Sequence, residues 1–193
     1  SELHTLPAVT PYIHPSVPTP DHLRLPVPPG GLSVGLVWAA NPANKAMYRH
    51  KSIPLRLLMP RLIDLIDLDL IDLHVLQFGK DNAQLDPWRT HERITDWSDC
   101  INDFADTAHV LQQLDLVVTV DTAVAHLSGA LNRATWLLLP RNCDFRWLLD
   151  RRDSPWYPSS LRLFRQQDHG DWDNVVRDLN EALDDLFLID LAA

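Results

Sequence analysis

The sequence predicts an α/β fold built on a doubly wound parallel sheet, and three observations support this prediction. Short apolar runs alternate along the chain with segments of helical pattern, which is typical of a parallel sheet with helices on both faces. The apolar runs are nearly continuous, as expected for strands that are buried on both sides. The chain has 193 residues, of which 46% are hydrophobic and 22% charged, so it is long enough for one globular domain with its own core.

The N-terminal segment is predicted to lie outside the sheet. Residues 1–29 contain eight of the 15 prolines, and Gly30 and Gly31 close the segment. Proline fixes the backbone and removes a hydrogen-bond donor, so such a segment is unsuited to a sheet. We therefore interpret residues 1–31 as an extended arm or linker and residues 32–193 as the folded domain. An arm of this length suggests that the chain is a fragment of a longer protein.

An apolar run predicts the first strand of the domain, and a capping signal predicts its first helix. The run SVGLVWA at residues 33–39 predicts a buried strand. Ser52 is predicted to cap a helix that has Pro54 in its first turn and ends near Asp67, because serine favours the N-cap and proline the first turn. The stretch that follows contains aspartates at irregular intervals, and we interpret it as a helix end and then a strand.

The later elements continue the alternation. Thr107 is predicted to cap a helix that ends at Leu114, and LDLVVTV at residues 114–120 is the clearest strand in the chain. The other strands are expected at residues 73–79, 92–95, 134–140 and 161–166, a loop or short helix at 81–90, and further helices at 122–131 and 172–188. In a parallel sheet of this kind ligands bind beyond the carboxyl ends of the strands, so the residues that follow them are the candidates for function.

The segment VTVDTAVAHLSGAL at residues 118–131 places an acid, a hydroxyl and an imidazole where a strand is followed by a helix. The free amides at a helix N-terminus hold anions such as phosphate, and the small residues here allow a ligand to approach the backbone. His126 lies four residues after Thr122, on the same helical face. The alternative is that Asp121 or Thr122 is only an N-cap and that His126 is a partly buried helix residue.

A second signal is the distribution of charge. The net charge is −9, which argues against nucleic acid or an anionic membrane as the main partner, yet no acidic residue occurs between Asp21 and Asp64. Within this stretch YRHKSIP (48–54) places three basic or titratable groups beside the predicted helix start. Cations are disfavoured at a helix N-terminus, and a bound diphosphate would reverse that effect. The alternative is a solvated surface cluster.

Other patterns are weaker. Two cysteines do not make a disulfide framework, no metal-ligand spacing is present, and neither a dinucleotide fingerprint nor a P-loop occurs. No apolar stretch is long enough to cross a membrane and no signal-peptide pattern begins the chain, so we expect a cytoplasmic protein without a transmembrane segment. Arg146 falls in a long loop where a ligand-covering segment would lie. Equally, Trp147, Trp156 and Tyr157 could simply pack this loop down.

Several of these segments together resemble one family. They resemble the C-terminal, donor-binding half of family 9 glycosyltransferases, the ADP-heptose:lipopolysaccharide heptosyltransferase type, in the version that follows tetratricopeptide repeats. The segments are VGLVWAANP (34–42), KSIPL (51–55), DFADTAHVLQQLDLVVTVDTAVAHLSGAL (103–131), WLLLP (136–140) and FRWLLDRRDSPWYP (145–158).

The resemblance implies a GT-B architecture, in which two Rossmann-like halves meet and the C-terminal half holds a nucleotide-sugar. It implies that Lys51 contacts the diphosphate and that the helix after Asp121 cradles it. The full set of donor-binding residues expected from the resemblance and from position is Asn41, Arg49, Lys51, Gln77, Lys80, Asp106, Thr107, Asp121, Thr122, Ala123, His126 and Arg146. The family often has glycine where Ala40 stands, and its catalytic base resides in the N-terminal half, so no catalytic residue is assigned in this chain.

We therefore expect the donor-binding domain of an inverting, metal-independent glycosyltransferase. Its partners would be a nucleotide-sugar donor, a glycolipid or protein acceptor, and an N-terminal half or tetratricopeptide region outside this chain; no cofactor is expected. Three alternatives remain at this point: a sugar-nucleotide epimerase-like enzyme, a non-catalytic interaction module with the same fold, and a degenerate transferase that binds nucleotide without activity.

Overall fold

The computed structural model describes residues 9–26 and 30–190. Its strands are β1 (Leu32–Val37), β2 (Ile71–Val75), β3 (Ile94–Asp96), β4 (Leu116–Val120), β5 (Thr135–Leu139) and β6 (Leu161–Arg165). Its helices are α1 (Lys45–Lys51), α2 (Leu55–Asp67), α3 (Phe104–Leu111), α4 (Ala123–Ala130) and α5 (Asp173–Asp190), with 3-10 turns η2 (Asp21–Leu23), η3 (Gly79–Leu85) and η4 (Phe145–Trp147).

The six strands form one sheet in the order β3-β2-β1-β4-β5-β6, and every pair is parallel. The chain winds outward from β1 to β3, returns to the centre at β4, and then winds outward to β6. The predicted doubly wound parallel sheet is confirmed. The neighbouring strands β1 and β4 mark the point where the winding reverses, and this point positions the candidate site.

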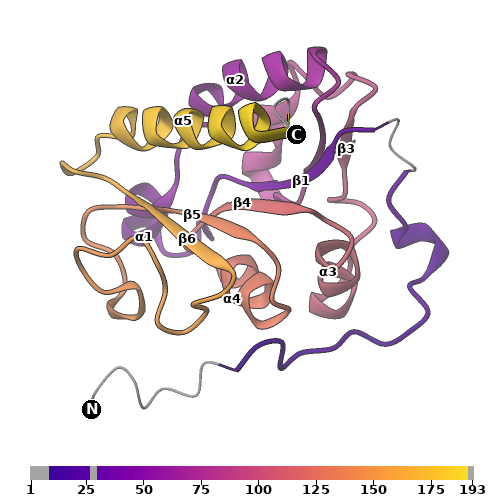
Figure 1. The fold of residues 1–193 in the computed structure, drawn as a ribbon, viewed down its shortest axis with the longest axis horizontal. Helices are drawn as coiled ribbons and strands as arrows, with labels where there is room; N and C mark the ends of the chain where they lie inside the picture. The colour runs from indigo at the N-terminus through magenta and orange to yellow at the C-terminus, as the bar shows by residue number, and fades with distance from the viewer. Residues whose placement is uncertain (1–8, 27–29, 191–193) are drawn as a thin grey trace.

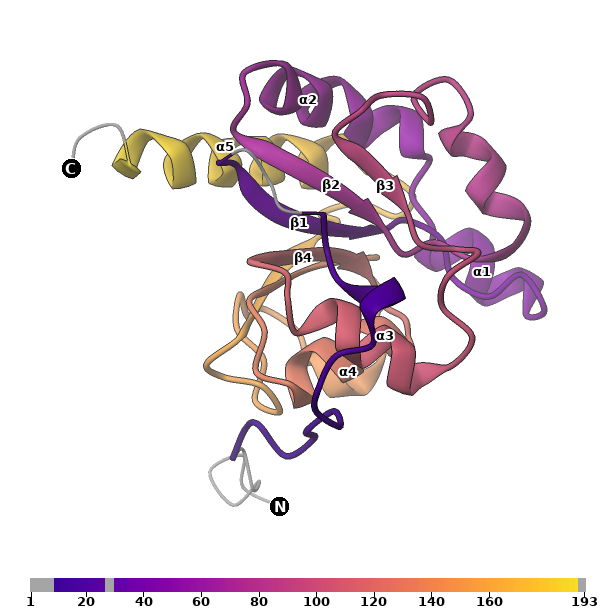
Figure 2. The same cartoon turned by 90° about the vertical axis from the view of Figure 1, so that its right-hand side faces the viewer.

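Helices cover both faces of the sheet. Figures 1 and 2 show α2 and α5 side by side on one face and α3 and α4 on the opposite face. Helix α2 turns its apolar side inward because its buried residues recur at helical spacing, at Leu55, Leu58, Met59, Leu62, Leu65 and Ile66. The strands between these helices are buried throughout, which explains why β4 and β5 are apolar at almost every position.

The first correction concerns residues 45–51, for which the sequence analysis named no helix. They form helix α1, and Ser52 is its C-cap, because the Ser52 N–H donates to the carbonyl of Tyr48 at 3.0 Å. Helix α2 begins after Pro54, so the prediction of Ser52 as its N-cap was wrong. No residue of α1 is buried, and a helix without an apolar stripe leaves no periodic signal in the sequence.

The second correction concerns the start of α3. Its N-cap is Asp103, whose Oδ1 accepts hydrogen bonds from the backbone N–H groups of Ala105 at 2.8 Å and Asp106 at 2.9 Å. Thr107 was therefore wrongly predicted as the cap. It lies inside the helix, and its hydroxyl donates to the Asp103 carbonyl at 2.8 Å. Aspartate and threonine both favour the N-cap position, so the sequence alone did not show whether α3 begins at Asp103 or at Thr107.

The N-terminal arm contains no strand within its described part, residues 9–26 and 30–31; residues 1–8 and 27–29 of the predicted arm lie outside the described residues. Leu23 is nonetheless fully buried and packs with α3 and β4. The division at residue 31 therefore stays a prediction about domains, although the arm itself lies against the fold. None of the helices among the described residues is both long and apolar enough to cross a membrane.

Candidate functional site

The candidate site lies at the carboxyl edge of the sheet, where β1 and β4 are neighbours but the segments that follow them diverge. After β1 the chain passes through α1 and α2 towards β2, and after β4 it passes through α4 towards β5. Such a reversal leaves a crevice at which ligands bind in open α/β sheets. Lys51 ends α1 and Asp121 follows β4, so the two residues reach this edge of the sheet from the two sides of the reversal.

Lys51 and Asp121 meet in an ion pair. The Lys51 Nζ lies 2.6 Å from the Asp121 Oδ2, and the two side chains are only 15% and 5% exposed. The Oδ2 atom is buried and accepts no hydrogen bond of good geometry, so the ammonium of Lys51 is its counter-ion. Removing both charges from water is unfavourable, and their attraction offsets that loss only while the pair stays intact. The pair therefore holds the Lys51 ammonium next to Asp121, two residues before the start of α4.

The N-terminus of α4 is open. Thr122 is the N-cap residue, but its side chain makes no capping hydrogen bond; the hydroxyl lies 3.5 Å from the Thr119 hydroxyl. Ala123, the first helical residue, is exposed. The first amides of a helix lack intrahelical partners and carry partial positive charge. The Ala125 N–H donates to the Thr122 carbonyl at 3.1 Å, whereas the N–H groups of Ala123 and Val124 make no hydrogen bond to the described residues and can donate to an oxyanion.

His126 lies one turn further along α4, between two aromatic rings. Its imidazole stacks on Trp147 with 4.9 Å between the ring centres, and its Nδ1 lies 3.2 Å from the Tyr157 hydroxyl. Trp147 and Tyr157 are both buried. Of the three rings that were interpreted as packing the loop down, Trp147 and Tyr157 do so, on a surface that includes His126, whereas Trp156 is 38% exposed.

Charges of both signs surround His126. Burial lowers the pKa of the His126 imidazole, and the positive charges of Lys51 and Arg146 act in the same direction, whereas Asp121 and Asp144 act against it. Burial prevails, so the ring is neutral at pH 7. Lys51 belongs to α1 and pairs with Asp121 after β4, while Asp144 and Arg146 pair with each other in the loop after β5.

The loop after β5 contributes Asp144, which the sequence analysis missed. Its Oδ1 accepts hydrogen bonds from the Arg146 backbone N–H at 3.1 Å and from the Arg146 guanidinium at 2.8 Å. Burial raises the pKa of Asp144, but these hydrogen bonds and the charges of Arg146 and Lys51 outweigh it and lower that pKa. An aspartate directly before FRW is a capping signal and could have been found in the sequence.

Gln77 is predicted as a donor-binding residue, and the structure gives its side chain another partner. It is 5% exposed, and its Oε1 accepts hydrogen bonds from the backbone N–H groups of Trp38 at 3.2 Å and Ala39 at 2.8 Å. Gln77 thus ties the end of β2 to the end of β1. Its amide oxygen is occupied in this way, so any role towards a ligand stays a prediction.

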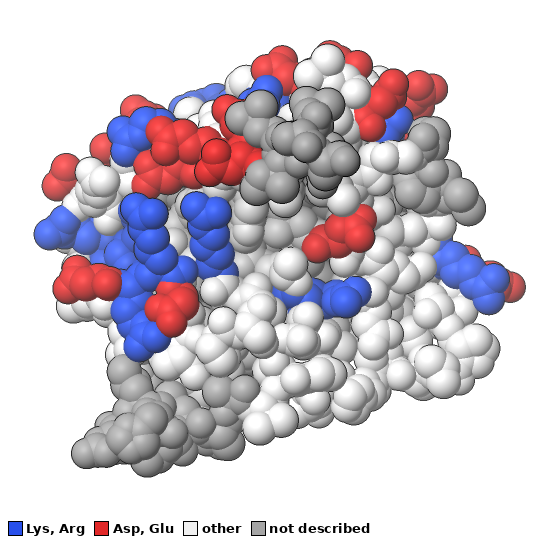
Figure 3. Space-filling model, viewed as in Figure 1, with Lys and Arg blue, Asp and Glu red and all other residues white. Residues whose placement is uncertain are grey.

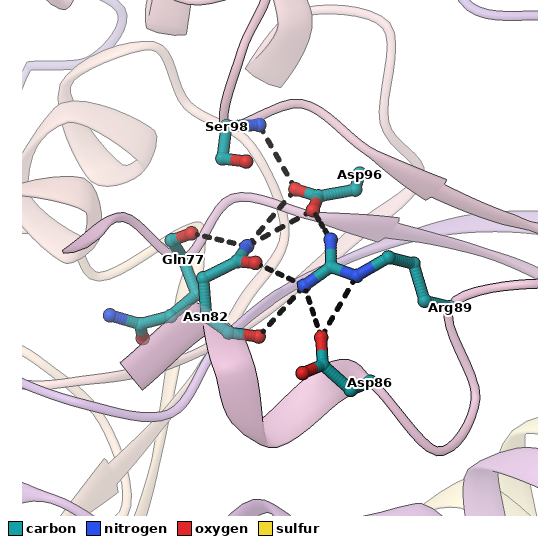
Figure 4. A network of polar contacts seen from close by, with 6 residues as sticks. All are labelled: Gln77, Asn82, Asp86, Arg89, Asp96 and Ser98. Carbon is teal, nitrogen blue, oxygen red and sulfur yellow. Dashed lines mark hydrogen bonds and ion pairs between the residues drawn. The ribbon is translucent and has the colours of Figure 1, made fainter. Parts of the chain in front are cut away.

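A polar network lies beside Gln77 at the ends of β2 and β3 (Figure 4). Asn82 donates to the Gln77 carbonyl at 2.9 Å and to Asp96, while Arg89 pairs with Asp96 and Asp86 and donates to the Asn82 side chain. The side chains of Asn82, Arg89 and Asp96 each bond to at least two other residues of the network. Such a network fixes the geometry of this edge rather than offering free groups to a ligand.

Lys80 is exposed on η3 beside this edge. Its Nζ lies 5.1 Å from the centre of the Tyr48 ring, and the Tyr48 hydroxyl donates to Asp81 at 2.5 Å. The hydrogen bond to Asp81 raises the pKa of Tyr48 to about 12, with burial adding to the effect. Lys80 therefore contacts α1 through Tyr48, and its ammonium stays accessible.

The remaining predicted residues occupy three places. Asn41 is exposed in the loop after β1, where its Oδ1 accepts a hydrogen bond from the Ala43 N–H at 2.9 Å. Arg49 is exposed on α1. Asp106 accepts hydrogen bonds from Asn102, which lower the pKa of Asp106. Thr107 is buried and donates within α3. The roles of these four residues towards a ligand stay predictions.

A second hollow, of about 820 Å³, lies on another part of the molecule, between β6 and α5. Figure 3 shows basic side chains over the β6 region and acidic side chains along α5 above them. The charged residues that line it are Arg141, Arg151, Arg152, Arg162 and Arg165 together with Asp150, Asp178, Glu181 and Asp185. Both signs of charge face this hollow, with five arginines opposite four acidic side chains.

The fold matches solved heptosyltransferase structures. The chain is similar to the E. coli ADP-heptose lps heptosyltransferase II, with 20% identity and a TM-score of 0.59 over 83% of this chain and 47% of that one. It is also similar to E. coli heptosyltransferase WaaC in structures with ADP and with ADP-2-deoxy-2-fluoro heptose, each at 16% identity and a TM-score of 0.55, over 84% and 86% of this chain. No protein-family model and no curated protein sequence matches the chain.

These likenesses show the fold. The chain spans about half the length of each heptosyltransferase that it matches, 47% of one and 45% of the other. The predicted resemblance to a heptosyltransferase-type half of a GT-B fold is therefore confirmed at the level of architecture.

Proposed function

We propose that this chain is the donor-binding half of a glycosyltransferase and that it holds a nucleoside diphosphate sugar by its diphosphate. The observation that carries the proposal is the position of Lys51, whose ammonium is held 2.6 Å from Asp121 beside the uncapped N-terminus of α4. This arrangement supplies positive charge from two sources at the switch point of the sheet, where ligands bind in such folds.

In the proposed complex the diphosphate lies between Lys51 and the first amides of α4. The ammonium keeps its contact with Asp121 and donates another of its three N–H groups to a phosphate oxygen, and the amides near Thr122 and Ala123 donate to the phosphates. Negative charge grows on the diphosphate as the bond to the sugar breaks, so groups that bind this charge accelerate the reaction. These residues and Arg146 are the reason for proposing a mechanism that does not depend on a metal ion.

The proposed chemistry is an in-line displacement at the anomeric carbon, with inversion. A hydroxyl of the acceptor attacks the carbon, the nucleoside diphosphate leaves, and a carboxylate removes the proton from the hydroxyl. We place this base in a second half outside the chain, since the chain spans about half of the transferases that it matches. The acceptor would be a glycolipid or a protein. The chain alone should bind nucleotide and turn over poorly or not at all.

Calorimetry with ADP, UDP, GDP and adenosine tests the proposal. We expect one diphosphate to bind more tightly than its nucleoside, and Lys51→Ala to weaken the diphosphate by about 10- to 100-fold, because a hydrogen bond to a charged group contributes about 1.5–3 kcal/mol. Lys45→Ala is the matched control. Lys45 is exposed at the other end of α1, and no ion pair involving it occurs within residues 9–26 and 30–190.

Two results would contradict the proposal. If no nucleotide binds below the millimolar range, the chain is a non-catalytic module with the same fold. If Lys51→Ala weakens adenosine as much as ADP, Lys51 does not contact the diphosphate. Binding without turnover, even after the missing half has been supplied, would identify a degenerate transferase.

A further inference from the structure

The N-terminal arm is attached to the helices that carry the site. The Tyr12 N–H donates to the carbonyl of Ala130, at the end of α4, at 3.0 Å, and Thr10 donates to the Asn132 side chain at 2.9 Å. Further along, the Gln113 side chain donates to the Leu23 carbonyl at 2.7 Å. Figures 1 and 2 show the arm running past α3 and α4. Residues 9–26 are therefore docked at both ends.

A line of polar atoms leads from this arm to the site. The Tyr12 hydroxyl lies 3.3 Å from the Tyr157 hydroxyl, which lies 3.2 Å from the Nδ1 of His126. The Tyr157 ring is held tightly, because it lies so close to Gly129 that a Cβ there would come within 2.5 Å of it. The His126 ring is held by its stacking on Trp147. The side chains of Tyr157 and His126 therefore have restricted orientations.

We propose that Tyr12 is a positioning residue for the diphosphate site, acting through Tyr157 to hold the His126 imidazole with its Nε2–H directed at the ligand. In this arrangement Tyr12 donates to the Tyr157 oxygen, and Tyr157 donates its own proton to Nδ1. A hydroxyl that accepts one hydrogen bond becomes a better donor in the next, so the two bonds support each other. With Nδ1 accepting, the proton of the neutral ring resides on Nε2.

The tautomer decides what His126 can offer to a phosphate. Burial lowers the pKa of His126, so the ring reaches the ligand uncharged at pH 7. A neutral imidazole donates from only one nitrogen, and the partner of the other nitrogen determines which one. Nε2 makes no hydrogen bond within the described residues and is not buried without a partner. It is therefore the nitrogen that remains for a ligand.

The role of Nε2 towards a phosphate rests on the proposed function, but the positioning of His126 is tested without any ligand. The test is nitrogen-15 NMR of the histidine rings in the whole chain, with His126 assigned by comparison with His126→Gln. In the wild type we expect separate Nδ1 and Nε2 shifts typical of the Nε2–H form. In Tyr12→Phe the two shifts should move towards each other, as the tautomer ratio falls by about three- to tenfold with loss of a hydrogen bond. Tyr157→Phe should produce a larger change.

Thr10→Val is the matched control. Thr10 belongs to the same arm but contacts Asn132 and Ser159 rather than Tyr157, so this variant should leave the His126 signals as they are. Unchanged signals in Tyr12→Phe would overturn the proposal. So would equal changes in Tyr12→Phe and Thr10→Val, because the arm would then act by packing alone.

ADP binding to the same variants provides an independent readout. If the wild-type chain binds ADP, Tyr12→Phe should weaken it by up to about twofold, because the apparent affinity follows the fraction of the ring in the Nε2–H tautomer. If the wild type binds no nucleotide, the proposed function fails while the NMR result still decides the role of Tyr12. If ADP binds equally well to both proteins although the NMR signals change, Nε2 does not contact the ligand and the role of Tyr12 in the site is overturned.

Discussion

Replacing Lys51 by methionine should destabilise the fold far more than replacing Lys51 and Asp121 together. At 2.6 Å and an effective dielectric constant of about 20, the attraction between the two charges is about 6 kcal/mol. Most of this offsets the loss of hydration of both ions, so the intact pair contributes little net stability. Methionine leaves the carboxylate of Asp121 buried and alone. We expect a loss of about 3–5 kcal/mol in the free energy of unfolding.

Asp121→Asn in the Lys51→Met background removes the stranded charge and should recover most of that stability. Urea unfolding followed by circular dichroism measures all four proteins of the cycle, since the midpoint and slope give the free energy of unfolding. Lys45→Met again serves as the surface control. A loss below about 1 kcal/mol in Lys51→Met would show that the pair behaves as an exposed salt bridge. The reasoning that Asp121 holds Lys51 beside the start of α4 would then fail.

Three further predictions concern the fold. Gly129→Ala should lower the unfolding free energy by about 1–3 kcal/mol in urea unfolding, because the new methyl group meets the Tyr157 ring. Burial lowers the pKa of His74 to about 4, so between pH 6.5 and 4 the unfolded chain binds a proton at His74 that the folded chain does not. The free energy of unfolding should therefore fall by up to roughly 3 kcal/mol as the pH drops from 6.5 to 4. His74→Phe should flatten this dependence in a series of unfolding curves at different pH. Asp103→Ala should cost about 0.5–2 kcal/mol as a lost cap, measured by thermal unfolding, and equal stability with the wild type would refute the capping role.

The sheet was predictable because parallel strands buried on both faces must be apolar at nearly every position. The runs that became β4 and β5 meet this condition, and both strands were predicted to within about two residues. Helix α1 was not predictable in the same way. Its stability comes from capping by Asn44, whose side chain accepts from the Met47 N–H, and from its favourable C-terminal charges, and neither produces a hydrophobic period.

Part of the candidate site was predictable from topology alone. Residues that follow β1 and β4 must meet at one edge of the sheet, so Lys51 and Asp121 could be placed together without knowing their contacts. Contacts between distant segments were not predictable. Nothing in the sequence joins Tyr12 to Tyr157, 145 positions away, because their meeting depends on how the arm docks on α4. Gln77 was predicted to contact a ligand because it is a polar residue at the end of a strand. In the structure its amide oxygen instead accepts a hydrogen bond from the backbone that follows β1.

The cationic segment before α2 led to the right region through an argument that the structure overturns. The cluster was expected to stand at a helix N-terminus, where only a bound anion would offset its unfavourable charge. Arg49, His50 and Lys51 instead form the last turn of α1, where positive charge stabilises the helix without any ligand. The cluster alone therefore does not require an anion. The argument for a bound anion is instead the position of the Lys51 ammonium, which pairs with Asp121 beside the uncapped N-terminus of another helix, α4. At that position the charge of Lys51 adds nothing to the stability of α1.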